Sequence, residues 1–320
     1  LEIIILTLSN VCSKKICVSL FKFGLLDTNG IDSVLCFIKS IEFLLENGYE
    51  IPLIITSKEA PEYTKISKDF ESLAKKIGAK YLSTFQLNSV ESSAFIKDCG
   101  DVDIAISFNY PSIISQEIIN LFPLGILNAH GGDLPKYRGN ACQAWAIING
   151  EDKIGLCIHS MIGGELDSGN IIEREYLNIN SNTKVTECWQ WMEKRIPFMF
   201  LNSVQKLQEN SEYFLEEQSK DCKDVLRCYP RVLSDGKINW IKSNIEILRL
   251  INASNKPYSG AYCFYKNEKM IIWDAEIYED NEIYLSEPRQ VLMINKDGSI
   301  IIATGNGKLK INEVECNGHI

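Results

Sequence analysis

The sequence has no long apolar run, little histidine and no excess of positive charge. No stretch of its 320 residues approaches the roughly 20 apolar residues that a membrane helix needs. The N-terminus also lacks the basic region and the small-residue cleavage site of a signal peptide. A membrane or secreted protein is therefore not expected. The net charge is −9, from 33 basic and 42 acidic residues, which disfavours a protein that grips a long polyanion.

Signatures of metal and nucleotide sites are missing as well. Neither Cys12 with Cys17 nor Cys222 with Cys228 has a histidine nearby, so no metal site is predicted. Eleven cysteines, an odd number with many in apolar contexts, are typical of a reducing compartment, and we expect a cytoplasmic protein. No GxGxxG or Walker pattern is present, so the usual signals for a dinucleotide or a P-loop nucleotide are absent.

The first 175 residues alternate strand-like and helix-like segments. The expected strands are residues 52–56, 81–83, 104–108 and 124–127, and the expected helices are 34–44, 66–77, 89–99, 115–121 and 140–149, with a longer helix over much of 185–207. Asn140 is the expected N-cap of its helix, and either residues 2–7 or 16–20 form the first strand. This alternation predicts an α/β fold with a Rossmann-like, mostly parallel sheet and helices on both faces.

Beyond about residue 210 the composition changes to short β-rich runs separated by turn signals. The runs cover residues 261–265, 270–273, 291–294, 300–303 and 309–314, after a helix near 243–253. They predict a small β-rich C-terminal domain, an OB-like barrel. We therefore expect a catalytic domain over residues 1–209, a linker over 210–235 and the β-rich domain over 236–320.

The segment Asn128-Ala129-His130 ends an apolar strand, so the side chains of Asn128 and His130 emerge on the same side. Two glycines follow, which let a ligand approach the backbone closely, and Asp167-Ser168-Gly169 comes later. An amide donor, an imidazole and a carboxylate together can support acyl transfer. Each alone is ordinary: His159, in an alternating run, is interpreted as a structural hydrogen-bonding residue.

These residues resemble the folate-dependent formyltransferase family. The motifs that carry the resemblance are Asn128-Ala129-His130, Leu134-Pro135-Lys136-Tyr137-Arg138-Gly139 and Asp167-Ser168-Gly169-Asn170-Ile171. Residues 107–110, 122–125, 149–151, 231–240 and 257–261 are also similar, so the likeness runs from about residue 33 almost to the end. Two features depart from the pattern. The loop 161–166 is one residue longer, so its glycines must absorb the extra residue for Asp167 to reach the site. After Arg138-Gly139, where the family often has Ala-Pro, this chain has Asn140-Ala141-Cys142-Gln143.

The resemblance implies 10-formyltetrahydrofolate as donor, an amine as acceptor and no metal. It implies that Asn128 stabilises the oxyanion, that His130 takes the proton of the amine, and that Asp167 supports the imidazole. Implied contacts to the folate are Asn109, Tyr110, Ile113, Gly163 and Asp167. Expected contacts to the second substrate are Gly131, Arg138, Arg195 and Arg231, with Arg227 as a further cation for a diphosphate. Arg138 can equally brace the glycine-rich loop.

The acceptor is chosen among branches of this family. The segment from Arg231 to Ile320 has eleven basic and twelve acidic residues, a net charge of about −1. This charge disfavours tRNA binding, and thus a methionyl-tRNA formyltransferase, because phosphate contacts need cations. The chain is too long for a glycinamide ribonucleotide formyltransferase. We therefore expect formylation of a nucleotide-linked amino-deoxy sugar, such as a dTDP-amino-dideoxyhexose for a surface polysaccharide, with no nucleic-acid or membrane partner and with homodimers. The alternatives are the tRNA enzyme and a non-catalytic folate-binding protein. Nucleotide, sugar and amino position stay open.

Overall fold

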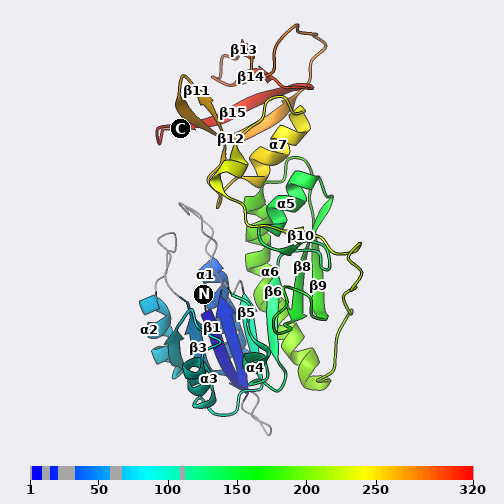
Figure 1. Ribbon diagram of the computed structural model, residues 1–320. Coiled ribbons are helices and arrows are strands. Elements are labelled where there is room, and N and C mark those ends of the chain that lie inside the picture. The colour runs from blue at the N-terminus through cyan, green and yellow to red at the C-terminus, as the bar shows by residue number, and fades with distance from the viewer. Residues whose placement is uncertain (1, 9–14, 21–32, 58–66, 109–111, 320) are drawn as a thin grey trace.

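A computed structural model describes residues 2–8, 15–20, 33–57, 67–108 and 112–319. Its central feature is a sheet of order β4-β3-β1-β2-β5-β6-β8-β9 (Figure 1). The strands are β1 (Glu2–Leu8), β2 (Lys15–Leu20), β3 (Tyr49–Thr56), β4 (Lys80–Ser83), β5 (Ile104–Phe108), β6 (Ile126–His130), β8 (Lys153–Ser160) and β9 (Ile171–Asn178). Both candidate first strands are therefore strands.

The parallel part of the sheet runs from β4 through β3, β2 and β5 to β6. Antiparallel β8 and β9 extend it beyond β6, and β1 pairs antiparallel with β2 and β3. The predicted α/β fold with a parallel sheet is thus confirmed, with antiparallel strands added. The helices of this part are α1 (Ser33–Glu46), α2 (Ser67–Ile77), α3 (Val90–Lys97), α4 (Gln116–Ile119), α5 (Cys142–Asn149) and α6 (Val185–Glu209).

Helices cover both faces of the sheet, and the alternation along β3 shows why. Ile54 is buried in the core that α1 and α6 share, whereas its neighbours Leu53 and Ile55 are buried in the core under α3 and α4. Successive side chains of a strand point to opposite faces, so a strand buried on both faces has a continuous apolar run. The side chains of Phe37 and Phe200 fill the first core, from α1 and α6.

Serine caps start several helices, but the predicted cap at Asn140 is wrong. Ser89 and Ser115 accept hydrogen bonds from the backbone N–H groups of Ser92 and Ile118 at the starts of α3 and α4. The N-cap of α5 is instead Ala141, which has φ 54° and no side-chain cap. The chain before it is held elsewhere, because the short strand β7 (Arg138–Gly139) pairs with β10 (Arg227–Cys228) and the Asn140 N–H donates to the carbonyl of Cys228.

The C-terminal domain contains α7 (Asn244–Ala253) and an antiparallel sheet of order β11-β12-β15-β14-β13. These strands are β11 (Ala261–Tyr265), β12 (Glu268–Tyr278), β13 (Val291–Ile294), β14 (Ile300–Ala303) and β15 (Lys308–Cys316). Buried side chains of α7, such as Leu248, share a core with Leu309 and Ile311 of β15. The predicted β-rich domain is confirmed, as an open sheet with β11 and β13 at its ends rather than a closed barrel.

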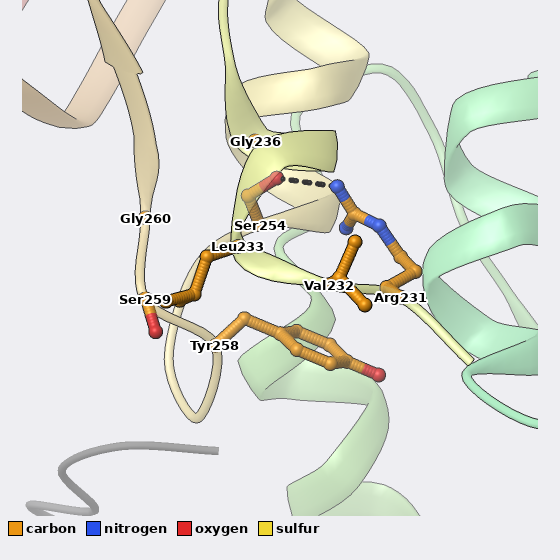
Figure 2. A pocket seen from close by; sticks show the side chains of 8 residues that line it. All are labelled: Arg231, Val232, Leu233, Gly236, Ser254, Tyr258, Ser259 and Gly260. Atoms are coloured by element: carbon orange, nitrogen blue, oxygen red, sulfur yellow. Dashed lines mark hydrogen bonds between the residues drawn. The ribbon is translucent and has the colours of Figure 1, made fainter. Parts of the chain in front are cut away.

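The two parts meet where α7 lies near α5 (Figure 1). Arg231 links the chain before α7 to the end of that helix. Its guanidinium donates to the Ala253 carbonyl at 2.9 Å and to the Ser254 hydroxyl at 3.0 Å. Figure 2 shows this arginine at a small pocket with Tyr258 and the loop that carries Ser259. Asn252 donates across the same junction to the Ser181 carbonyl, at 2.8 Å.

Candidate active site

Asn128 and His130 lie on one face of β6 and are nearly buried, with 8% and 7% of their surfaces exposed. The antiparallel pairing of β6 with β8 places Asn128 directly opposite His159 and His130 opposite Cys157. Opposite residues of an antiparallel pair project to the same face of the sheet. His159 therefore joins the two predicted residues on that face, with 1% of its surface exposed.

Asp167 reaches this group from the loop after β8. Its Oδ2 lies 3.6 Å from His130 Nδ1, and its Oδ1 lies 3.5 Å from His159 Nε2. The backbone N–H of Gly139 donates to Oδ2 at 2.9 Å. In the loop before Asp167, Gly164 has φ 80°, a backbone conformation that glycine adopts without strain, and Asp167 itself has φ 51°. The structure thus brings together the three residues that the motifs single out.

Asp167 stays ionised in this position. Burial raises the pKa of its carboxyl group, but His130, His159 and the Gly139 N–H together lower it by more, so the pKa lies well below its usual range. A permanently charged carboxylate beside an imidazole stabilises the protonated imidazole. The pair can therefore accept a proton and hold it during a reaction.

Backbone carbonyl groups near the imidazole rings of His130 and His159 show which ring nitrogen carries the proton in each neutral ring. The Tyr137 carbonyl lies 2.7 Å from His130 Nε2 and can only accept, so Nε2 is the N–H donor and Nδ1 is the atom that exchanges a proton. The Ser160 carbonyl lies 2.9 Å from His159 Nδ1, so Nδ1 donates there. In neutral His159 the lone pair is then on Nε2, which accepts from the Asn128 amide nitrogen at 3.2 Å.

One support of this group, Gln218, lies outside the motifs. Gln218 donates to the carbonyls of Asp167 and Gly169, at 2.9 and 2.6 Å, and accepts from the Arg138 guanidinium at 2.8 Å. It lies in the expected linker, where no periodicity or spacing marked it. Arg138 therefore helps to hold the loop of Asp167 indirectly, through Gln218. A substrate contact by Arg138 and its bracing of the glycine-rich loop stay predictions.

Tyr137 is held by the segment Asn149-Gly150-Glu151. Its hydroxyl donates to Glu151 at 2.5 Å and accepts from Asn149 at 3.2 Å. This fixes a buried residue of φ 56° whose carbonyl receives the His130 N–H. The Cys142 thiol donates to the same carbonyl at 2.8 Å. The similarity of residues 149–151 to the family thus has a physical reason.

The remaining predicted contacts lie outside this group. Gly131 is buried where a Cβ would lie 1.8 Å from the Gln143 amide nitrogen, and Gly163 packs against Gln116 of α4. Ile113 is 49% exposed. Asn109 and Tyr110 lie outside the described residues.

Two of the predicted arginines have internal partners. Arg195 makes a two-pronged ion pair with Glu175, with both distances 2.7 Å, and Arg231 binds the end of α7. Both guanidinium groups therefore already have partners within the protein, and a substrate contact by either stays a prediction. Arg227 is exposed, with its guanidinium 5.8 Å from the Tyr229 ring.

The part of the chain that the structure describes has neither a membrane-spanning helix nor a cluster of metal ligands. No helix there is long and apolar enough to cross a membrane. Within the same residues, no group of three or more His, Cys, Asp or Glu side chains could hold a metal ion.

Comparison with known proteins identifies the family. The formyl transferase domain matches residues 32–197, and the formyl transferase C-terminal domain matches residues 233–319. The chain belongs to the formyl transferase family. The expectation of a formyltransferase enzyme is thereby confirmed. A curated relative, the methionyl-tRNA formyltransferase of Acetivibrio thermocellus, is 27% identical over 283 residues, which cover 87% of this chain and 88% of the relative.

Two solved structures show the same fold. The N-formyltransferase from Helicobacter canadensis, in complex with folinic acid and dTDP-3-aminofucose, has a TM-score of 0.63 at 17% identity, covering 94% of this formyltransferase and 100% of that chain. HypX from Aquifex aeolicus, in complex with tetrahydrofolic acid, has a TM-score of 0.57 at 15% identity over 83% of this chain. The formyltransferase spans 44% of HypX, less than half its length.

Gly132→Ala tests how closely the loop must approach His130 in this formyltransferase. A Cβ at residue 132 would lie 2.3 Å from the Tyr137 carbonyl oxygen and 2.5 Å from His130 Nε2. A backbone oxygen cannot yield as a side-chain end can, so we expect a loss of about 10²-fold in formyl-transfer rate. Gly131→Ala is the control, because its Cβ meets the ends of Gln143 and Met192, and should lose less. Equal rates for Gly132→Ala and wild type would contradict the geometry.

Proposed function

We propose that this formyltransferase transfers the formyl group of 10-formyltetrahydrofolate to the amino group of a nucleotide-linked amino-deoxy sugar. The observation that carries the proposal is the meeting of Asn128 and His130, on one face of β6, with the charged Asp167 from the loop after β8. It combines an N–H donor for a developing oxyanion with a base and its counter-charge. A protein that only binds folate has no use for this combination.

The folate supplies an electrophilic formyl carbon, and the protein supplies the proton transfers. As the substrate amine forms its bond to that carbon, the Asn128 amide stabilises the negative charge on the formyl oxygen. His130 Nδ1 takes the proton that the amine loses, and Asp167, 3.6 Å away, stabilises the resulting imidazolium. When the bond to the folate nitrogen breaks, the imidazolium returns its proton to the leaving nitrogen.

The charge of the C-terminal domain supports a small acceptor rather than tRNA. Its eleven basic and twelve acidic residues from Arg231 to Ile320 provide few cations for a polyanion. A diphosphate needs only a few local cations. Arg227 is exposed on β10, which pairs with the strand β7 whose Gly139 holds Asp167. The Helicobacter canadensis neighbour, solved with dTDP-3-aminofucose, supports the same acceptor class.

A methionyl-tRNA formyltransferase is the second candidate, because the curated relative at 27% identity has that name. For this chain we expect weak binding to initiator tRNA that is lost at moderate salt, since counterion release needs many cation–phosphate contacts. Electrophoretic mobility shift at two salt concentrations measures this. Tight, salt-resistant binding would overturn the sugar proposal.

The direct test is a transfer assay with 10-formyltetrahydrofolate and a panel of nucleotide-linked amino sugars beside methionyl-tRNA. Turnover of an amino sugar with none of tRNA is the expected result. Turnover of tRNA alone would establish the second candidate, and turnover of neither would favour a folate-binding protein. A cytoplasmic location, homodimers and a product for surface polysaccharide stay predictions, and sedimentation velocity tests the dimer.

A further inference from the structure

We propose that His159 is a positioning residue that orients the side-chain amide of Asn128. The inference rests on the proposed formyl transfer, and it assigns a role in that reaction to a histidine that the sequence motifs leave out. It begins from the pairing of β6 with β8, which sets the two residues directly opposite each other.

The His159 ring is held in one orientation. Only 1% of the residue's surface is exposed, and Nδ1 donates to the Ser160 carbonyl at 2.9 Å. A neutral imidazole has one donor and one acceptor nitrogen, so this bond makes Nε2 the acceptor. Nε2 lies 3.2 Å from the Asn128 amide nitrogen, which can donate to it.

This bond selects one of the two orientations of the amide. When the amide nitrogen of Asn128 faces His159, one of its two N–H groups donates to His159 Nε2. The second N–H is then available to donate to the formyl oxygen. With the amide rotated by half a turn, its oxygen would face the lone pair of Nε2, which is repulsive. Without an acceptor at residue 159 both orientations become accessible, and one presents an oxygen instead of a donor to the developing oxyanion.

The carboxylate of Asp167 offers a competing role, because its Oδ1 lies 3.5 Å from His159 Nε2. If His159 acted chiefly as a charge partner of Asp167, its replacement would slow the reaction whether or not Asn128 were present. If it acts through Asn128, its replacement matters only while the amide is there. This difference separates the two roles.

The test is a double-mutant cycle of His159→Leu and Asn128→Ala, measured as single-turnover formyl transfer at high enzyme concentration. We expect His159→Leu alone to lower the rate about tenfold with little change in KM, and to have no further effect in the Asn128→Ala background. His159→Gln, whose side-chain oxygen can accept from Asn128, should recover part of the loss. Equal losses in both backgrounds, or a wild-type rate for His159→Leu, would overturn the proposal.

A second measurement needs neither the amine substrate nor a correctly folded His159→Leu variant. Nitrogen NMR of the wild-type protein with labelled histidine should show neutral His159 protonated at Nδ1, with the Nε2 signal shifted by Asn128→Ala. A proton on Nε2 of neutral His159, or an unshifted signal, would overturn the inference. If the wild-type protein formylates no amine, the proposed function fails, while the NMR result still decides the orientation of the amide.

Discussion

Asn128→Ala is expected to lower kcat for formyl transfer by about 10²–10³-fold, because a lost oxyanion donor typically costs that much. Asn128 is nearly buried on β6, and its second amide N–H has the formyl oxygen as its expected partner. The interaction strengthens as charge develops, so the binding of folate and amino sugar should change little. Steady-state kinetics with the accepted sugar, together with calorimetric titration of each substrate, measure both effects.

Asn252→Ala is the matched control for this variant. Asn252 is also buried, with 1% exposed against 8% for Asn128, and its amide donates to the Ser181 carbonyl at 2.8 Å. Removing that hydrogen bond should cost about 0.5–1.5 kcal/mol of stability and leave kcat unchanged. A kcat for Asn128→Ala within a few-fold of the control would exclude Asn128 as the oxyanion donor. Loss of transfer with intact binding would exclude a mere folate-binding protein.

Asp167→Asn is expected to lower kcat by about 10⁴-fold, by analogy with other carboxylates that support a catalytic imidazole. The variant keeps the shape of the side chain but removes the charge that faces His130 and His159. The imidazolium then lacks its counter-charge when it holds the amine proton. The exposed Asp98, paired with Lys80 at 2.6 Å, is the control carboxylate, and Asp98→Asn should retain the wild-type kcat.

The same variant should change how stability depends on pH. The pKa of Asp167 is lower in the folded chain than its ordinary value of 3.8, so the carboxylate stabilises the fold above about pH 4. This contribution is lost as the pH falls below that value toward the folded pKa. Urea unfolding should therefore show a smaller stability loss between pH 5 and pH 3 for Asp167→Asn than for wild type. Identical losses would show that the folded pKa is not depressed.

Much of the fold follows from local patterns. The limits of β11, β13 and β14 agree with the predicted runs, because turn residues bound each run and strand propensity is a local property. The Asn140 cap failed for the opposite reason, since the pairing of β7 with β10 depends on residues about ninety positions apart in the chain. Helix α5 therefore begins at Cys142, after a residue with φ 54°.

The sequence by itself determined the family motifs, the α/β alternation and the shared face of Asn128 and His130, because a strand has a period of two. Only the tertiary structure decided which distant groups meet that face. The register of β6 with β8 places His159 opposite Asn128. Gln218, which lies in the expected linker, donates a hydrogen bond to the Asp167 carbonyl and so holds its loop. Such contacts depend on strand pairing and chain path, and no local periodicity records either.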